Sequence, residues 1–180
     1  MIDFKVEADK GFFFSKFDDA FVCQKKNHFQ VSVSLNISDI PFYYRIKNHQ
    51  NIYKIEKFKL MVFGIKQEAP LEIIPIRESH SDRKPVKYEP IEFKYTKKEC
   101  LKLTKKRLHF SQTTNNNNRK KNKPNPDQRY FYCIVQIEIV NNLGESHTLC
   151  SSSSERVIVR VRSENISIKY LKLMIVYFRL

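Results

Sequence analysis

The sequence predicts an all-β protein, an antiparallel β-sandwich with long basic loops. Three observations predict this class. Apolar and polar residues alternate with a period of two in several short segments, polar turn-rich stretches separate these segments, and no segment has the 3.6-residue periodicity of an amphipathic helix. Many short strands joined by such loops are typical of a sandwich.

In the N-terminal half, Phe12–Phe17 is a weak strand candidate and Phe29–Leu35 is a strong one. Every second residue of Phe29–Leu35 is apolar and the residues between are Gln or Ser, so we expect one dry and one wet face. Tyr53–Phe63 is also strand-like, but its apolar parity switches between Ile55 and Phe58. This switch predicts a bulge or a twist.

In the C-terminal half, alternation recurs in Ile91–Tyr95, in Phe131–Ile139 and in Val157–Val161, with Leu101–Phe110 as a weaker candidate. The alternation in Val157–Val161 places Arg160 on the wet face. These segments complete a set of seven to nine expected strands, enough for two layers.

Three stretches are predicted to be irregular. Glu72–His80 is broken by Pro75, so it cannot form a long helix. Thr113–Asp127 holds no apolar residue able to join a core, so we expect it on the surface, and the serine run Ser151–Ser154 reads as a flexible connection. A strand candidate follows each of the last two, so neither marks a domain boundary in a chain of 180 residues.

The charge balance points to an anionic partner. The chain has 33 Lys and Arg against 19 Asp and Glu, a net charge of +14, and a pI near 9.6. The segment Lys94–Arg129 holds twelve basic and two acidic residues, which is most of this imbalance. A basic surface concentrated beside a long exposed loop favours a polyanion or an acidic protein as partner.

Enzyme and metal chemistry find little support. The three glycines, Gly11, Gly64 and Gly144, lie too far apart for a phosphate-binding loop, and there is no GxSxG elbow, metal-ligating His spacing or CxxC pair. We therefore expect no catalytic residue, no metal site, no cofactor and no small-molecule substrate. The N-terminus has no apolar signal region, so four buried free thiols are expected. The apolar stretch Leu171–Leu180 is shorter than the ~20 residues that cross a bilayer, so no membrane segment is expected.

Several strings resemble the DNA-binding domain of the myelin regulatory factor family. The three long ones are DDAFVCQKKNHFQV (Asp18–Val31), RLHFSQTTNNNNRKKNKPNPDQRYF (Arg107–Phe131) and SERVIVR (Ser154–Arg160), with FGIK (Phe63–Lys66) and SDRKP (Ser81–Pro85) in order between them. The resemblance runs from about Gly11 to Arg160. It divides the chain into a PhoG-like DNA-binding sandwich over residues 1–162 and an unmatched C-terminal tail over residues 163–180.

The resemblance implies more than composition does. The family has an s-type immunoglobulin-like β-sandwich related to that of the yeast meiotic transcription activator, and its members bind double-stranded DNA sequence-specifically as transcription factors in the nucleus. Its full-length precursors are anchored in the endoplasmic reticulum membrane and trimerise through a downstream domain. Neither of those regions is found in this chain, so we expect the isolated domain to be a monomer.

Candidate DNA-binding residues follow by motif position. Arg83 and Arg107 are expected to read bases, because the guanidinium fork matches the O6 and N7 edge of guanine. The remaining candidates are loop, turn and strand residues expected to contact phosphate or lie beside it: Lys25, Lys26, Gln30, Arg119, Lys120, Lys121, Lys123 and Arg160. Asn117 and Asn118 are further candidates for adenine edges. The family has Gly where this chain has Lys106 and Asn122.

Two other functions stay open at this point. The first is an immunoglobulin-like adaptor that docks an acidic protein through the same basic face. The second is sequence-neutral RNA binding with Tyr130 and Tyr132 as stacking platforms. A basic pentamer such as Arg119–Lys123 also fits a nuclear-import signal, which is compatible with DNA binding.

Overall fold

The computed structural model describes residues 2–38, 42–46, 50–80, 84–95, 100–118, 123–161 and 171–177, and every regular element in these ranges is a β-strand. The strands are β1 (Ile2–Asp9), β2 (Phe12–Ser15), β3 (Ala20–Gln24), β4 (Phe29–Ile37), β5 (Tyr43–Arg45), β6 (Ile52–Lys66), β7 (Ile73–Ile74), β8 (Ile76–Ser79), β9 (Pro85–Lys87), β10 (Ile91–Phe93), β11 (Leu101–Phe110), β12 (Phe131–Asn141), β13 (Ser146–Ser154), β14 (Val157–Arg160) and β15 (Leu171–Tyr177).

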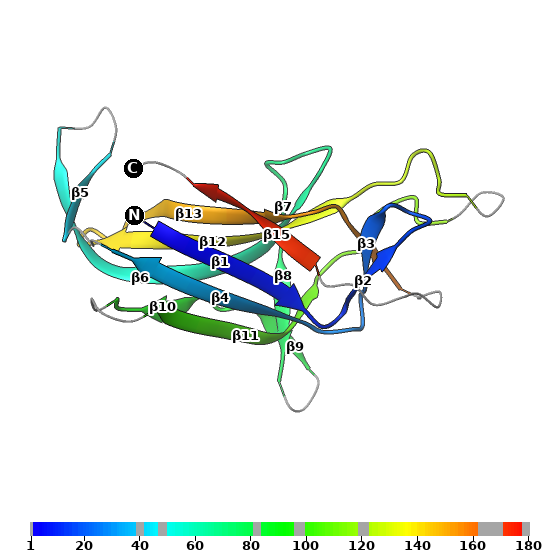
Figure 1. The fold of residues 1–180 in the computed structure, drawn as a ribbon, viewed down its shortest axis with the longest axis horizontal. Coiled ribbons are helices and arrows are strands. Elements are labelled where there is room, and N and C mark those ends of the chain that lie inside the picture. Colours follow the sequence, from blue (N-terminus) through cyan, green and yellow to red (C-terminus); the bar gives the residue numbers. More distant parts are fainter. Residues whose placement is uncertain are drawn as a thin grey trace.

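The strands form two layers (Figure 1). One layer has the order β1-β4-β11-β8-β9, and the other is built on β6, β12 and β13. β15 pairs with β13 on one side and with β1 on the other, so it links the two layers along one edge. The all-β prediction is confirmed, and the strands expected at Phe29, Ile91, Leu101 and Phe131 are all present.

The alternation of the sequence becomes the core. The odd-numbered apolar residues of β4 and β12 are buried, and their polar neighbours Ser32, Ser34 and Gln136 are half-buried on the opposite faces. Phe110 of β11 links the layers, with its ring centroid 5.4 Å from that of Phe29 and 6.0 Å from that of Phe131. Burial of each such side chain contributes about 1.5–3 kcal/mol, so these pairs hold the layers together.

The predicted irregularity in β6 is confirmed as a bulge. Val140 of β12 lies opposite Lys57, and the next residue, Asn141, lies opposite Ile55. Glu56 is therefore the extra residue, and the apolar parity changes across it.

Two strand predictions were wrong in detail. β14 has no wet face: all four of its residues are buried, because it pairs in parallel with β3 and Ile158 packs against Ala20 and Val22. This parallel pair also departs from the purely antiparallel arrangement. The serine run belongs to β13 rather than to a flexible connection, and the Cys133 N–H donates a hydrogen bond of 2.8 Å to the Ser154 hydroxyl.

The thiols and the C-terminal segment add two further findings. All four cysteines are free; Cys23, Cys133 and Cys150 are buried as expected, but Cys100 is exposed. The C-terminal stretch that the resemblance leaves unmatched supplies β15, which pairs with both layers.

The domain limits of 1–162 and 163–180 stay a prediction. The described residues include no helix long and apolar enough to cross a membrane.

Candidate nucleic-acid interface

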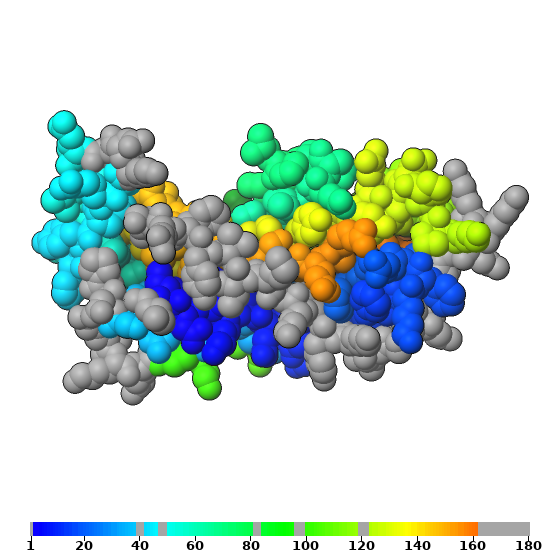
Figure 2. Space-filling model, turned by 45° about the horizontal axis from the view of Figure 1, so that its top comes forward, coloured from blue at the N-terminus to red at the C-terminus, as the bar shows by residue number. Residues whose placement is uncertain are grey.

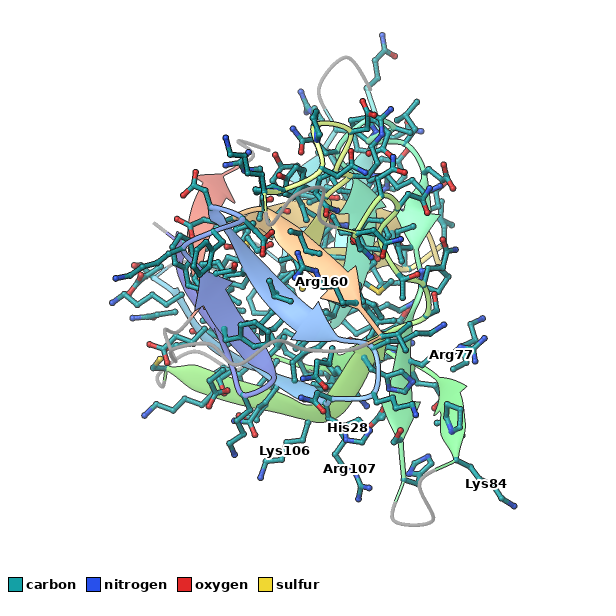
Figure 3. All side chains as sticks on the ribbon, turned by 90° about the vertical axis from the view of Figure 1, so that its right-hand side faces the viewer. His28, Arg77, Lys84, Lys106, Arg107 and Arg160 are labelled. Carbon is teal, nitrogen blue, oxygen red and sulfur yellow. The ribbon has the colours of Figure 1, made fainter. Side chains whose placement is uncertain are left out.

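A basic cleft of about 1000 Å³ lies at one end of the sandwich. Four cations line it, and the described part of its lining includes no carboxylate. The lining consists of Lys25, Lys26, His28, Arg77, Ser79, Pro85, Arg107, His109, Phe110, Ser111 and Val161. Figure 3 shows His28 and Arg107 beside the β8–β9 hairpin, which carries Arg77 and Lys84.

Strand pairing brings these distant segments together. β11 pairs with β4 on one side and with β8 on the other, so Leu108 lies between Phe29 and Glu78. His109 lies opposite Arg77 of β8. The turn that precedes β4, the end of β11 and the start of the β8–β9 hairpin therefore meet at one edge, and each contributes cations to the same cleft.

Arg107 is held outward by a second bulge. Lys105 pairs with Val31 and Leu108 pairs with Phe29, so Lys106 and Arg107 together lie opposite Gln30. Arg107 has a φ of 59°, a left-handed conformation that is rare for a residue other than Gly, Asn or Asp. Bulges re-aim side chains, and residues in strained conformations cluster at functional sites. The exposed Arg107 side chain projects at the cleft (Figure 3).

The β3–β4 turn presents two more cations. Lys25 and Lys26 are exposed, and the Lys25 N–H donates a 2.7 Å hydrogen bond to the carbonyl oxygen of Arg160. The Asn27 N–H donates to the Gln24 carbonyl at 2.9 Å, which closes the turn. The two ammonium groups are thus carried on an anchored backbone. Gln30 is half-buried on β4, across from the bulge.

Arg160 itself differs from the exposed contact that the sequence predicts. Its side chain is 9% exposed and its Nη2 lies 2.9 Å from Oδ1 of Asp18, whose side chain is 1% exposed. The Ser15 hydroxyl donates a 2.6 Å hydrogen bond to the other Asp18 oxygen. Figure 3 shows Arg160 within the fold, apart from the labelled cations of the cleft. Arg160 therefore ties β14 to the β2–β3 turn, and its carbonyl holds Lys25.

The long basic loop is tied at its base rather than lying wholly on the surface. The Thr114 N–H donates a 3.1 Å hydrogen bond to the Val159 carbonyl oxygen, and the Val159 N–H donates one of 3.1 Å to the Thr114 hydroxyl. The Asn117 amide donates to the Val159 carbonyl at 3.1 Å, and Gln128 donates to Asn117 Oδ1 at 2.8 Å. Thr114 and Gln128 are buried. The side-chain amide of Asn117 is engaged in this network. Asn117 is therefore not available for the adenine contact that the sequence predicts.

The described part of the loop lies at the same end of the molecule as β2 and β3 (Figure 1). Figure 2 shows the yellow-green loop next to the blue N-terminal strands and the orange β14 region. Lys123 is exposed on this loop. Four predicted contacts, Arg83, Arg119, Lys120 and Lys121, lie outside the described residues.

Other basic residues are engaged within the protein. Lys105 forms a 2.7 Å ion pair with Glu78, and Arg156 forms one of 3.1 Å with Asp19. The guanidinium of Arg156 also lies 5.0 Å from the Tyr130 ring centroid. This contact covers a ring that the RNA-binding alternative needs for base stacking.

A histidine pair in the cleft was not predicted. The ring centroids of His28 and His109 are 5.6 Å apart in an edge-to-face arrangement. Burial lowers the pKa of His28, and the charge of Arg107 lowers it further. Burial also lowers the pKa of His109, with additional contributions from His28, Arg77 and Lys25. The spacing of the histidines along the chain gives no sign of this pair, because their pairing depends on strand register.

A switch in the parity of the apolar residues of β11 marks the bulge at Arg107 in the sequence. The apolar residues of β11 are odd-numbered at Leu101 and Leu103 and even-numbered at Leu108 and Phe110. The same kind of parity switch had located the bulge in β6. No group of three or more His, Cys, Asp or Glu side chains able to hold a metal occurs in the described ranges.

Comparisons with known proteins identify the family. Residues 20–165 match the NDT80/PhoG-like DNA-binding family. The chain is 44% identical over 159 residues to Myelin regulatory factor homolog 1 of Caenorhabditis elegans, which covers 86% of this chain and 17% of that protein. It is 27% identical over 169 residues to an uncharacterized protein of Dictyostelium discoideum, covering 86% of this chain and 14% of that protein. The chain thus spans less than a fifth of the length of either relative. On the match over residues 20–165, the chain belongs to the NDT80/PhoG-like DNA-binding family.

Proposed function

We propose that this chain is the sequence-specific, double-stranded-DNA-binding domain of a nuclear transcription factor, and that the basic cleft contacts the DNA. The observation that carries the proposal is the convergence of cations from separate elements on one cleft whose described lining includes no carboxylate. Such a surface attracts the phosphate backbone, which supplies most of the sequence-independent affinity of DNA-binding proteins. Family membership supports the same partner.

Arg107 is the proposed base-reading residue of the described part of the cleft. Its exposed side chain stands on a bulge in a strained backbone conformation, a feature that packing alone does not require. One bidentate contact to guanine discriminates against other bases by ~1–3 kcal/mol. Arg83, which in the sequence stands between β8 and β9, is proposed for a second base contact by its position in the SDRKP string.

The lysines are proposed as phosphate contacts. Lys25 and Lys26 on the anchored turn and Lys123 on the basic loop are exposed, and Arg119, Lys120 and Lys121 would extend the loop's contribution. Gln30, behind the bulge, would support the backbone that carries Arg107. Arg160 would act through the protein by holding Lys25 rather than by touching DNA.

The test is selection of bound duplexes from a random pool, followed by affinity measurements on three variants. Arg107→Ala should weaken the selected duplex more than a random one, whereas Lys123→Ala should weaken both about equally. Lys5→Ala is a matched control: it removes an exposed lysine paired with Asp3 on β1, and should change neither affinity.

Two results would contradict this assignment. Recovery of no enriched sequence would refute specific DNA binding. Equal losses from Arg107→Ala and Lys123→Ala would refute the base-reading role of Arg107. An acidic protein that remains bound in excess duplex DNA would instead support the adaptor function.

A further inference from the structure

The cleft contains two imidazoles whose setting fits an anion. His28 follows the β3–β4 turn and His109 lies near the end of β11, with their ring centroids 5.6 Å apart. The Nδ1 atom of His109 is buried and has no hydrogen-bond partner in the described part of the protein. Leaving this buried polar atom without a partner is costly, and packing alone does not explain it.

The charges that face the pair come from every neighbouring element. The β3–β4 turn contributes Lys25 and Lys26, β11 contributes Arg107, and β8 contributes Arg77. Lys87 of β9 lies opposite Arg77. The nearest carboxylate of β8, Glu78, is in an ion pair with Lys105. At the end of β14 the cleft is lined by the uncharged Val161, and the charge of Arg160 is paired with Asp18.

This positive surrounding explains why the free pair resists protonation. Burial and the neighbouring cations lower the pKa of both imidazoles from the ordinary histidine value, which disfavours their charged form in the unbound protein. A phosphate in the cleft reverses the sign of the local field and offers an acceptor to an N–H. Both effects favour the charged imidazole.

We propose that His28 and His109 form a phosphate-binding pair that takes up protons when a DNA backbone phosphate enters the cleft. This inference rests on the proposed function and adds to it two ligand-contacting residues and a pH dependence. Protons enter from solvent, no covalent bond changes, and each added proton gives an imidazolium that donates to a phosphate oxygen.

The direction and the upper limit of the pH dependence of DNA affinity follow from the linkage between proton binding and DNA binding. Because the bound state holds more protons, affinity rises as the pH falls, through the window between the bound pKa and the lower free pKa. The limit is tenfold per pH unit for each proton taken up. Because the pKa values of both free imidazoles are lowered from the ordinary histidine value, binding that raises them should increase the affinity for the selected duplex from pH 7.5 to pH 6.0 at constant ionic strength, within that tenfold limit.

The experiment is calorimetric titration of the selected duplex into the protein in two buffers of different ionisation enthalpy, which counts protons taken up on binding. Wild-type protein should show net uptake, and the His28→Gln, His109→Gln double variant should lose most of it. His147→Gln is the matched control, because His147 lies in β13 beside Tyr44 and is not part of the cleft. NMR titration of the wild-type imidazole C–H signals, free and bound, measures each pKa without any substitution.

The outcomes separate the inference from the proposed function. DNA binding without proton uptake, or with bound pKa values of His28 and His109 no higher than the free ones, overturns the inference alone. Uptake that persists in the double variant also overturns it. Absence of duplex binding at both pH values overturns the proposed function and this inference together.

Discussion

The ion pair between Asp18 and Arg160 gives the sharpest stability prediction. Asp18→Ala removes the carboxylate that lies 2.9 Å from the buried guanidinium of Arg160. The guanidinium then remains inside the fold without its counter-ion, because its side chain is only 9% exposed. The variant should therefore unfold more easily while keeping the same fold.

The magnitude follows from the burial of both partners. Breaking a buried pair by removing one member costs about 3–5 kcal/mol. For a chain of this size, each kcal/mol shifts the melting temperature by roughly 2–4 °C, so we expect a decrease of roughly 6–20 °C. The double variant Asp18→Ala, Arg160→Met leaves no uncompensated charge and should recover much of this loss.

Urea denaturation and thermal denaturation, both followed by circular dichroism, measure the free energy of unfolding and the melting temperature. Asp3→Ala is the matched control, since it removes an aspartate from an ion pair with Lys5 whose side chains are 51% and 69% exposed. Such a pair is worth about 0–1 kcal/mol. If Asp18→Ala costs no more than Asp3→Ala, the reasoning that makes Arg160 a buried structural residue is refuted.

Three further predictions follow from backbone geometry and burial. Arg107→Gly should raise the free energy of unfolding by about 1 kcal/mol, because Gly accepts a φ of 59°, while it weakens binding of the selected duplex; a loss of stability in urea denaturation would contradict this. Gly11→Ala should destabilise the protein more than Gly144→Ala, since both have positive φ but a Cβ at Gly11 would lie 2.4 Å from the His28 carbonyl oxygen and one at Gly144 meets open space; equal melting temperatures would refute the role of that contact. A thiol reagent at pH 8 should modify Cys100 rapidly and the three buried cysteines slowly, since burial raises the pKa of Cys133 to about 12; rapid modification of all four in the native protein would contradict the burial.

Alternation in the sequence was a sound guide wherever one face of a strand packs and the other meets water. β4 and β12 are strands of this kind, and their burial follows the alternation of apolar and polar residues. The bulge at Glu56 was also predictable, because the apolar residues of β6 change from odd to even positions across it. Alternation does not predict the burial of β14, because this strand is buried on both faces. Its Arg160 occupies a position that alternation assigns to solvent, and only the distant Asp18 shows why a charge is stable there.

The candidate site was predictable in its chemistry but not in its assembly. The basic clusters around Lys25 and Arg107 were visible in the sequence, and their meeting at one cleft depends on the order β4-β11-β8. The pairing of His28 with His109 depends on the same register. The tie between Asn117 and Val159 was invisible as well, because it joins a loop to a strand far along the chain.

The dissociation constants of the wild-type protein for a selected duplex and for a scrambled duplex, measured over a range of salt concentrations, test the central claim most directly. If the cleft and the basic loop together neutralise about six phosphates, the logarithm of each association constant should fall with the logarithm of salt at a slope near −5. The selected duplex should bind at least about 10³-fold more tightly than the scrambled one at physiological salt. Equal affinities for the two duplexes, or affinities that do not respond to salt, would contradict the account.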